Sequence, residues 1–177
     1  AHKLAALVDW PEASTALKLL EDEEPSSLMR TLRSCLGRGV AFHNSDLTSR
    51  QRKVVEDAFV NKEIKVIFST TTLAMGVNLS ADNVYLETVK YSSGAYNDKP
   101  SLVPVSRSEF DNMSGRAGRL DSDGSSINRP GRAVILAQSE FDREVLWKTY
   151  IDPEQPEPLD SVFEGLGREV EALRRRA

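Results

Sequence analysis

Asn112-Met113-Ser114-Gly115-Arg116-Ala117-Gly118-Arg119 places two arginines three residues apart, with a glycine directly before each. The preceding segment, Ser106-Arg107-Ser108-Glu109, has the pattern of a capping box and predicts that a helix begins there. Helical spacing would then put both arginines on one face. Two guanidinium groups beside glycines suit a phosphate chain, because each guanidinium offers a fork of donors. A solvated basic patch with flexible glycines is the alternative for this segment alone.

A second polar segment lies upstream, where a predicted strand ends. Ile64-Lys65-Val66-Ile67-Phe68 has the composition of a buried strand, and it runs into Ser69-Thr70-Thr71-Thr72. Ligands of open α/β sheets bind at the carboxyl edge of the strands, so this string of hydroxyl groups predicts a binding platform. For any single threonine, the alternative is a hydroxyl group that caps the next helix.

Three segments, taken together and in order, resemble the helicases of superfamily 2. The segment from Thr70 to Leu79 resembles their motif V, and the segment from Asn112 to Arg119 resembles their motif VI. Gly39 to Leu47, followed by Arg50-Gln51-Arg52, resembles the segment before these motifs. The combination is most similar to the superkiller-type RNA helicases and their archaeal DNA-repair relatives. The resemblance extends from about Leu28 to Asp160, which is most of the chain.

The chain departs from the family pattern at a few positions. Relatives usually have glutamine where Asn112 stands, proline at Thr71 and Ser80, and a second histidine at Asn44. Asparagine keeps the amide group of glutamine and shortens its reach by one methylene group. The missing prolines loosen the turns on either side of the hydroxyl platform.

The resemblance implies a role for residues in each motif. Arg119 and Arg116 would act as arginine fingers toward the γ-phosphate of ATP, which a first motor lobe holds with Mg²⁺. The residues implied to lie at the nucleotide are Asn112, Gly115, Gly76 and Asn78. The residues implied to hold the sugar-phosphate backbone of a nucleic acid are Thr70, Thr72, His43 and Asn44. For His43, a structural role is an equal alternative.

Composition indicates a soluble, intracellular protein. Hydrophobic residues make up 40% of the 177 residues, and the net charge of −4 argues against a free-standing basic nucleic-acid binder. Cys35 is the single cysteine, which excludes an internal disulfide and indicates a reducing compartment. We expect it to be a small buried hydrophobe on a helix. Two histidines and one cysteine cannot build a structural zinc site, and no apolar run approaches the roughly 20 residues that span a membrane.

Helices alternate with short apolar strands along the chain. This order predicts an α/β fold, a three-layer αβα sandwich with a mostly parallel sheet, and the resemblance implies the RecA-like version. Helices are expected within residues 3–22 (interrupted at Pro11), 26–36 and 48–60, and from Ser106 and Ser139 onward. Strands are expected at residues 39–43, 64–69, 83–89 and 131–137, and loops at 91–104 and 121–130. The acidic run Glu21 to Glu24 is expected to be a solvated helix end.

Residues 1–150 are predicted to be a C-terminal RecA-like helicase domain, whose first strand is expected upstream of residue 1. Residues 151–177 are predicted to be a proline-rich linker and a helix that leads toward a winged-helix domain of the relatives. The sequence contains no Gly-x-x-x-x-Gly-Lys-Ser/Thr phosphate loop and no acidic pair after a hydrophobic strand. ATP and Mg²⁺ are therefore expected mainly on an N-terminal RecA-like lobe, and this chain alone is expected to be inactive.

The implied function is that of the C-terminal motor lobe of an ATP-dependent DNA or RNA helicase. A non-catalytic RecA-like scaffold that binds protein or nucleic acid is the alternative. The acidic balance and Asn112 favour the scaffold, whereas the intact pair Arg116 and Arg119 favours the motor. An α/β hydrolase or a nuclease lacks support, because the sequence contains neither a nucleophile elbow nor a metal-ligand cluster.

Overall fold

The computed structural model describes residues 1–70, 79–93, 100–118 and 130–152. Four of the expected site residues, Thr72, Gly76, Asn78 and Arg119, lie outside these ranges, as does the predicted helix after the prolines. The chain divides into two compact units, and each is described by itself. The first unit contains residues 1–105 and 109–135, and the second contains residues 106–108 together with the segment from residue 136 onward.

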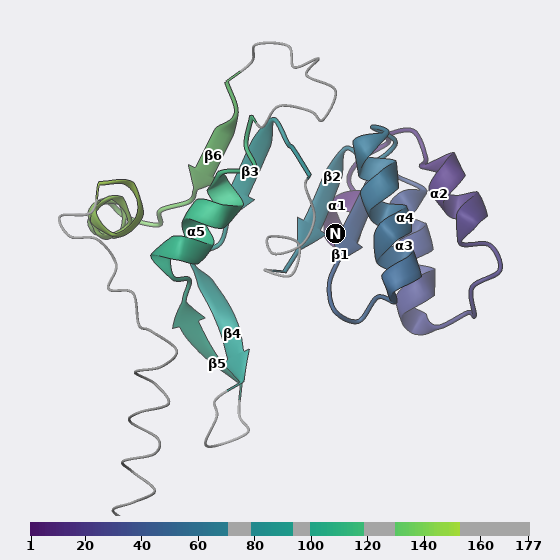
Figure 1. The fold of residues 1–177 in the computed structure, drawn as a ribbon, viewed down its shortest axis with the longest axis horizontal. Helices are drawn as coiled ribbons and strands as arrows, with labels where there is room; N and C mark the ends of the chain where they lie inside the picture. Colours follow the sequence, from purple (N-terminus) through teal and green to yellow (C-terminus); the bar gives the residue numbers. More distant parts are fainter. Residues whose placement is uncertain (71–78, 94–99, 119–129, 153–177) are drawn as a thin grey trace, which may run out of the picture. The chain divides into compact units, whose positions relative to one another are not determined.

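The amino-terminal part of the first unit alternates helices and strands, as the sequence predicts. In chain order its elements are α1 (His2–Ala5), α2 (Ser14–Leu19), α3 (Ser27–Leu36), β1 (Val40–His43), α4 (Ser49–Val60) and β2 (Val66–Ser69). β1 and β2 are parallel, with Val40 opposite Val66 and His43 opposite Ser69 (Figure 1). The connection between these parallel strands is α4, which makes a βαβ unit.

Helices cover both faces of β1, and this layering confirms the predicted α/β class. Alternate residues of a strand point to opposite faces. Val40 packs in one apolar cluster with Ala5 of α1 and Cys35 of α3. Ala41 belongs to a larger cluster, to which α4 contributes Val55 and its neighbours. Burial of these side chains from both sides holds the end of β1 at a defined position.

Two helices of this part begin with a side-chain cap. The hydroxyl group of Ser26 accepts a hydrogen bond from the backbone N–H of Met29 at the start of α3, at 3.0 Å. Thr48 and Gln51 form a complete capping box at the start of α4. The Gln51 side chain also donates to Glu23 at 2.8 Å, and Arg50 pairs with the same carboxylate. Glu23 is thus bound and largely buried, which corrects the prediction that the whole acidic run is solvated.

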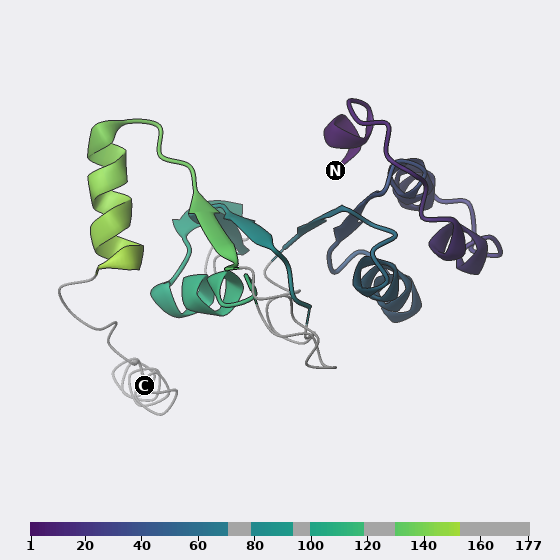
Figure 2. The same cartoon turned by 90° about the horizontal axis from the view of Figure 1, so that it is seen from above.

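The remainder of the first unit contains a second parallel strand pair and an antiparallel hairpin. β3 (Asn83–Leu86) pairs with β6 (Arg132–Ile135), with Asn83 opposite Arg132. β4 (Val89–Ser93) and β5 (Pro100–Pro104) pair antiparallel, with Tyr91 opposite Leu102. α5 (Arg107–Ser114) follows β5 directly, and it lies beside the β3–β6 pair in two perpendicular views (Figures 1 and 2).

The hairpin corrects the prediction of a loop over residues 91–104. The serines, glycine and prolines of this segment favour a loop by composition, but cross-strand pairs such as Tyr91 and Leu102 stabilise two strands. Pro100 and Pro104 stand at the ends of β5, positions that a strand tolerates because the missing N–H groups do not interrupt its centre. Residues 94–99 lie outside the described part of the chain.

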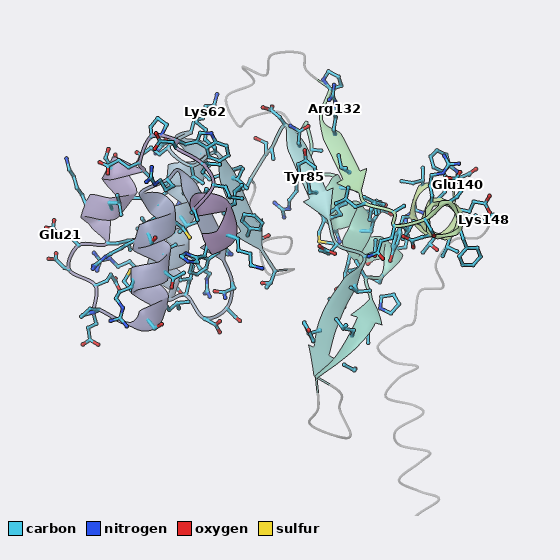
Figure 3. The ribbon with its side chains drawn as sticks, turned by 180° about the vertical axis from the view of Figure 1, so that it is seen from behind. Glu21, Lys62, Tyr85, Arg132, Glu140 and Lys148 are labelled. Atoms are coloured by element: carbon cyan, nitrogen blue, oxygen red, sulfur yellow. The ribbon has the colours of Figure 1, made fainter. Side chains whose placement is uncertain are left out.

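Three strands are partly exposed, among them β2, whose composition predicts a buried strand. In β2, Phe68 has 44% of its surface exposed, and in β6 Arg132 and Ala133 are exposed. On β3, Tyr85 is 73% exposed (Figure 3). A strand is buried by the elements that pack on its faces, which its own apolar composition does not specify.

The second unit contains α6 (Glu140–Leu146) and the π-helical turn η2 (Trp147–Ile151), which carry the labelled residues Glu140 and Lys148 (Figure 3). α6 begins directly after Ser139, where the sequence predicts a helix start, and Ser139 caps it by accepting a hydrogen bond from the N–H of Asp142 at 3.0 Å. The division into a domain of residues 1–150 and a linker of residues 151–177 stays a prediction, because the described part of the chain ends at residue 152.

Candidate nucleotide and nucleic-acid interface

The helix before the two arginines ends earlier than the sequence suggests. α5 stops at Ser114, and the N–H groups of Gly115 and Arg116 bond back to Asp111 and Met113 in the closing turn. The prediction that Arg116 lies on the helix is therefore wrong, because Arg116 follows α5, and Arg119 lies outside the described residues. A glycine at position 115 favours this ending, since glycine weakens a helix interior.

The expected nucleotide contacts that the structure describes gather at this helix end. Asn112 on the last turn of α5 and Gly115 directly after it are exposed, and Arg116 is half-buried. An exposed amide group, a bare backbone and a guanidinium group thus lie within five residues. The amide of Asn112 and the guanidinium of Arg116 are donors that suit phosphate and ribose oxygens, and Gly115 has no side chain to block a ligand, so the described residues fit a nucleotide.

The chain after motif V is tied to the chain after α5 by two backbone hydrogen bonds. The N–H of Ala81 donates to the carbonyl of Arg116 at 3.1 Å, and the N–H of Gly118 donates to the carbonyl of Ala81 at 2.9 Å. Together they form a parallel bridge between Ala81 and Ala117. Ala81 lies two residues after Leu79, where the segment that resembles motif V ends, so the bridge joins the chain just after motif V to the segment that resembles motif VI.

α5 itself is anchored on two sides. Phe110 is buried, and Glu109 in the first turn pairs with Lys90 on β4. The N–H of Val105 also bonds to the carbonyl of Thr88 at 2.9 Å, at the base of the hairpin. These contacts hold the orientation of the helix that leads into Gly115 and Arg116.

Three of the four expected nucleic-acid contacts lie together at the carboxyl end of the β1–β2 pair. His43, Asn44 and Thr70 line one open pocket of about 350 Å³. The N–H of Thr70 donates to the carbonyl of His43 at 3.2 Å, which extends the pairing of the two strands by one residue. The hydroxyl platform predicted at this sheet edge is thus present as far as Thr70, and Thr72 lies outside the described residues.

His43 is buried, although it belongs to this group. Only 2% of the residue is exposed, and its Nε2 atom lies 2.8 Å from Oε1 of Glu56 on α4. His43 is therefore packed like a core side chain, as its structural role predicts. It also lines the pocket where a nucleic-acid contact is predicted.

Sequence reasoning missed two residues of these clusters. Ala81 carries no chemical group that marks it, and only its place after motif V could have drawn attention. Glu56 falls between the apolar positions Val55 and Ala58 of an amphipathic helix, where the sequence pattern does not show that its carboxylate turns toward β1.

Within the described ranges, no group of three His, Cys, Asp or Glu residues is placed to hold a metal ion. None of the helices in those ranges is long and apolar enough to cross a membrane.

Burial raises the pKa of the Cys35 thiol. This agrees with the expectation that Cys35 is a buried side chain on a helix.

Comparison with known proteins extends these observations. The model of the helicase conserved C-terminal domain matches residues 14–121. The chain is 36% identical over 151 residues to the ATP-dependent DNA helicase Hel308 of Pyrobaculum calidifontis, a match that covers 85% of the chain and 20% of that protein. It is 38% identical over 159 residues to Hel308 of Methanocella arvoryzae, covering 87% of the chain and 20% of the relative. For Hel308 of Thermoplasma volcanium, the identity is 39% over 130 residues, covering 73% and 18%.

The chain thus spans about a fifth of the length of the curated relatives that it matches. The domain match includes both segments compared with motifs V and VI, and it confirms the resemblance to the C-terminal lobe of superfamily 2 helicases. The RecA-like α/β class that the resemblance implies is confirmed with it. On this match, which covers more than half of the sequence, the chain belongs to the helicase conserved C-terminal domain family.

Proposed function

We propose that this chain is the second motor lobe of an ATP-dependent DNA helicase. The bridge between Ala81 and Ala117 is the observation that carries the proposal, because it links the chain just after motif V to motif VI, and these motifs would face nucleic acid and nucleotide. The names of the relatives support DNA as the substrate and ATP as the fuel. A scaffold without motor function would have no need for the two arginines of the Gly-Arg-Ala-Gly-Arg sequence, Arg116 and Arg119.

In this proposal, Arg116 and Arg119 supply positive charge to the phosphate chain of ATP. The bound nucleotide would contribute the phosphoryl group, and Mg²⁺ held on the first lobe would offset part of its charge. An arginine finger offsets the charge that develops on the transferred group and contributes on the order of 10³ to 10⁵ in rate. Asn112 and Gly115, together with Gly76 and Asn78, contact the nucleotide.

The second cluster holds the DNA strand. His43, Asn44 and Thr70, continued by Thr72, offer polar groups at the carboxyl edge of β1 and β2. Contacts to sugar and phosphate do not depend on the base, so the grip is independent of sequence. A net charge of −4 makes this lobe a weak binder on its own, which fits a protein that grips DNA between two lobes.

The partner that completes the nucleotide site is an N-terminal RecA-like lobe of the same protein, which holds ATP and Mg²⁺. Closing of the two lobes on ATP and reopening after hydrolysis would favour different grips on the strand. The backbone bridge at Ala81 gives the moving lobe a connection from the turn at Arg116 to the chain just after motif V. The activity belongs to the full-length protein inside the cell, and this chain alone has none.

The test is the ATPase activity of the full-length protein with single-stranded DNA. Arg119→Ala and Arg116→Ala should each lower turnover by at least about a hundredfold, given the expected share of an arginine finger. Arg132→Ala, on the exposed part of β6, is the matched control and should keep normal turnover. Thermal unfolding separates loss of charge from loss of fold.

Near-normal turnover in the Arg119→Ala protein would remove this residue from the finger role. A wild-type full-length protein that binds DNA but shows no DNA-stimulated ATPase would instead support the scaffold.

A further inference from the structure

The buried contact between His43 and Glu56 connects the end of β1 with α4. The Nε2 atom of His43 lies 2.8 Å from Oε1 of Glu56, and the two side chains are 3% and 14% exposed. α4 runs alongside β1 (Figure 1), so the glutamate reaches the histidine from the helix that covers this face of the strand. A charged side chain that is mostly buried needs a partner, and the imidazole ring is that partner.

The carboxylate determines which ring nitrogen carries a proton. An ionised carboxylate only accepts hydrogen bonds, so Nε2 of His43 must donate to it. The other ring nitrogen, Nδ1, is then the one left for a further partner. A glutamate that orients a histidine in this way acts on the chemistry of the ring without touching a ligand itself.

Two polar atoms at this sheet edge are screened from solvent and lack a hydrogen-bond partner in the part of the chain that is described. They are Nδ1 of His43 and Oδ1 of Asn44. Both residues line the pocket at the ends of β1 and β2, together with Thr70. Buried polar atoms are normally paired, so this pair of adjacent residues indicates a site that a ligand or ordered water completes.

We propose that Glu56 is a positioning residue for the DNA contact of His43. Glu56 holds the ring so that Nδ1 serves the pocket, where the strand backbone passes. Nδ1 reaches a phosphate oxygen directly when the ring carries a second proton, and through a bridging water when the ring is neutral. The inference rests on the proposed function, because it assumes that the pocket at His43 is a DNA contact.

The neighbouring residue Asp57 offers a matched control. Its carboxylate pairs with Lys53 on the same helix at 2.6 Å, and its side chain is 50% exposed. Removing that charge changes the net charge of α4 by the same amount as removing Glu56. It leaves the contact with β1 in place.

The experiment uses the full-length protein and measures the single-stranded DNA concentration that gives half-maximal ATPase stimulation. Glu56→Leu should raise this concentration at least about threefold, and leave turnover at saturating DNA unchanged. Glu56→Gln keeps an oxygen that accepts from Nε2 and should behave like the wild type, as should Asp57→Asn. In a His43→Asn background, Glu56→Leu should add nothing, because a residue that acts through another shows no effect once that other is gone.

The outcomes separate the inference from the function on which it rests. If His43→Asn leaves the DNA requirement unchanged, the proposed DNA contact at this pocket is wrong. If His43→Asn raises the requirement but Glu56→Leu does not, or if the effects of the two changes simply add, Glu56 does not act through His43. A lower melting temperature with an unchanged DNA requirement would show that the pair only ties α4 to β1.

Discussion

Gly118 and Gly131 lie backbone against backbone. A Cβ atom built on Gly131 would stand 2.0 Å from the amide nitrogen of Gly118, and one built on Gly118 would stand 2.6 Å from the nitrogen of Gly131. Gly118 also has a φ of +66°, in the left-handed region that favours glycine. Glycine is therefore required at position 118, the second glycine of Gly115-Arg116-Ala117-Gly118-Arg119, for two reasons. One is its own backbone conformation, and the other is the close approach of Gly131, which leads into β6.

This close approach predicts that Gly131→Ala disturbs the arginine motif from a distance in sequence. The added methyl group overlaps backbone atoms, and such overpacking costs on the order of 1–3 kcal/mol. Because a misplacement of about 1 Å can cost roughly a hundredfold in rate, the DNA-stimulated ATPase of the full-length protein should fall by at least about tenfold. Gly37→Ala is the control, since a Cβ there would meet its nearest atoms at 3.5 and 3.6 Å. Equal activity of the two variants would contradict the packing argument.

The bridge at Ala81 predicts a second effect on activity. Ala81→Pro removes the N–H that donates to the carbonyl of Arg116 at 3.1 Å, because proline has no backbone N–H. We expect DNA to stimulate the ATPase of this variant at least about tenfold less. ATP affinity should stay near normal, because the first lobe holds most of the nucleotide in the proposed function. Ser80→Pro, at a position where the resembling helicases carry proline, should keep its stimulation by DNA. The coupling role of the bridge is wrong if both variants respond to DNA normally.

The capping box of α4 predicts a measurable loss of stability. Thr48→Ala removes the oxygen that accepts from the N–H of Gln51 at 3.2 Å, and such caps contribute about 1 kcal/mol. The free energy of unfolding, measured with urea, should fall by about that amount. Thr31→Ala is the comparison, because the hydroxyl of Thr31 donates to the carbonyl of Ser27 within α3, at 3.0 Å, and caps no helix start. A loss of the same size at both positions would show that the cap makes no special contribution.

Burial of Cys35 predicts a dependence of stability on pH. Its pKa is raised in the folded chain, so the folded state keeps the thiol proton at pH values where the unfolded chain has lost it. The contribution to stability is complete below the unfolded pKa of about 8.5 and is lost as pH rises through the higher folded value. The unfolding free energy should thus decline more steeply above about pH 8.5 than in the Cys35→Ala variant. Parallel curves for the two proteins would refute this role of the thiol.

Local chemistry made much of the fold predictable. Ser26, Thr48 and Ser139 each mark a helix start, because a cap needs only a side-chain oxygen and an N–H two or three residues away. The βαβ order of β1, α4 and β2 follows from apolar runs separated by one amphipathic helix. The hairpin over residues 89–104 was not predictable in this way, because its strands are stabilised by each other and not by their own composition.

The candidate site shows the same division. The amino-acid sequence alone determined which residue types are available. Among them are Arg116 and Arg119 of the segment that resembles motif VI, the polar groups at the end of β1 and the hydroxyl groups at the end of β2. Only the tertiary structure decided that α5 ends at Ser114, that Ala81 bonds to the turn at Arg116, and that Glu56 faces His43. Backbone bridges and buried ion pairs join residues that are distant along the chain, so their geometry depends on how whole elements pack.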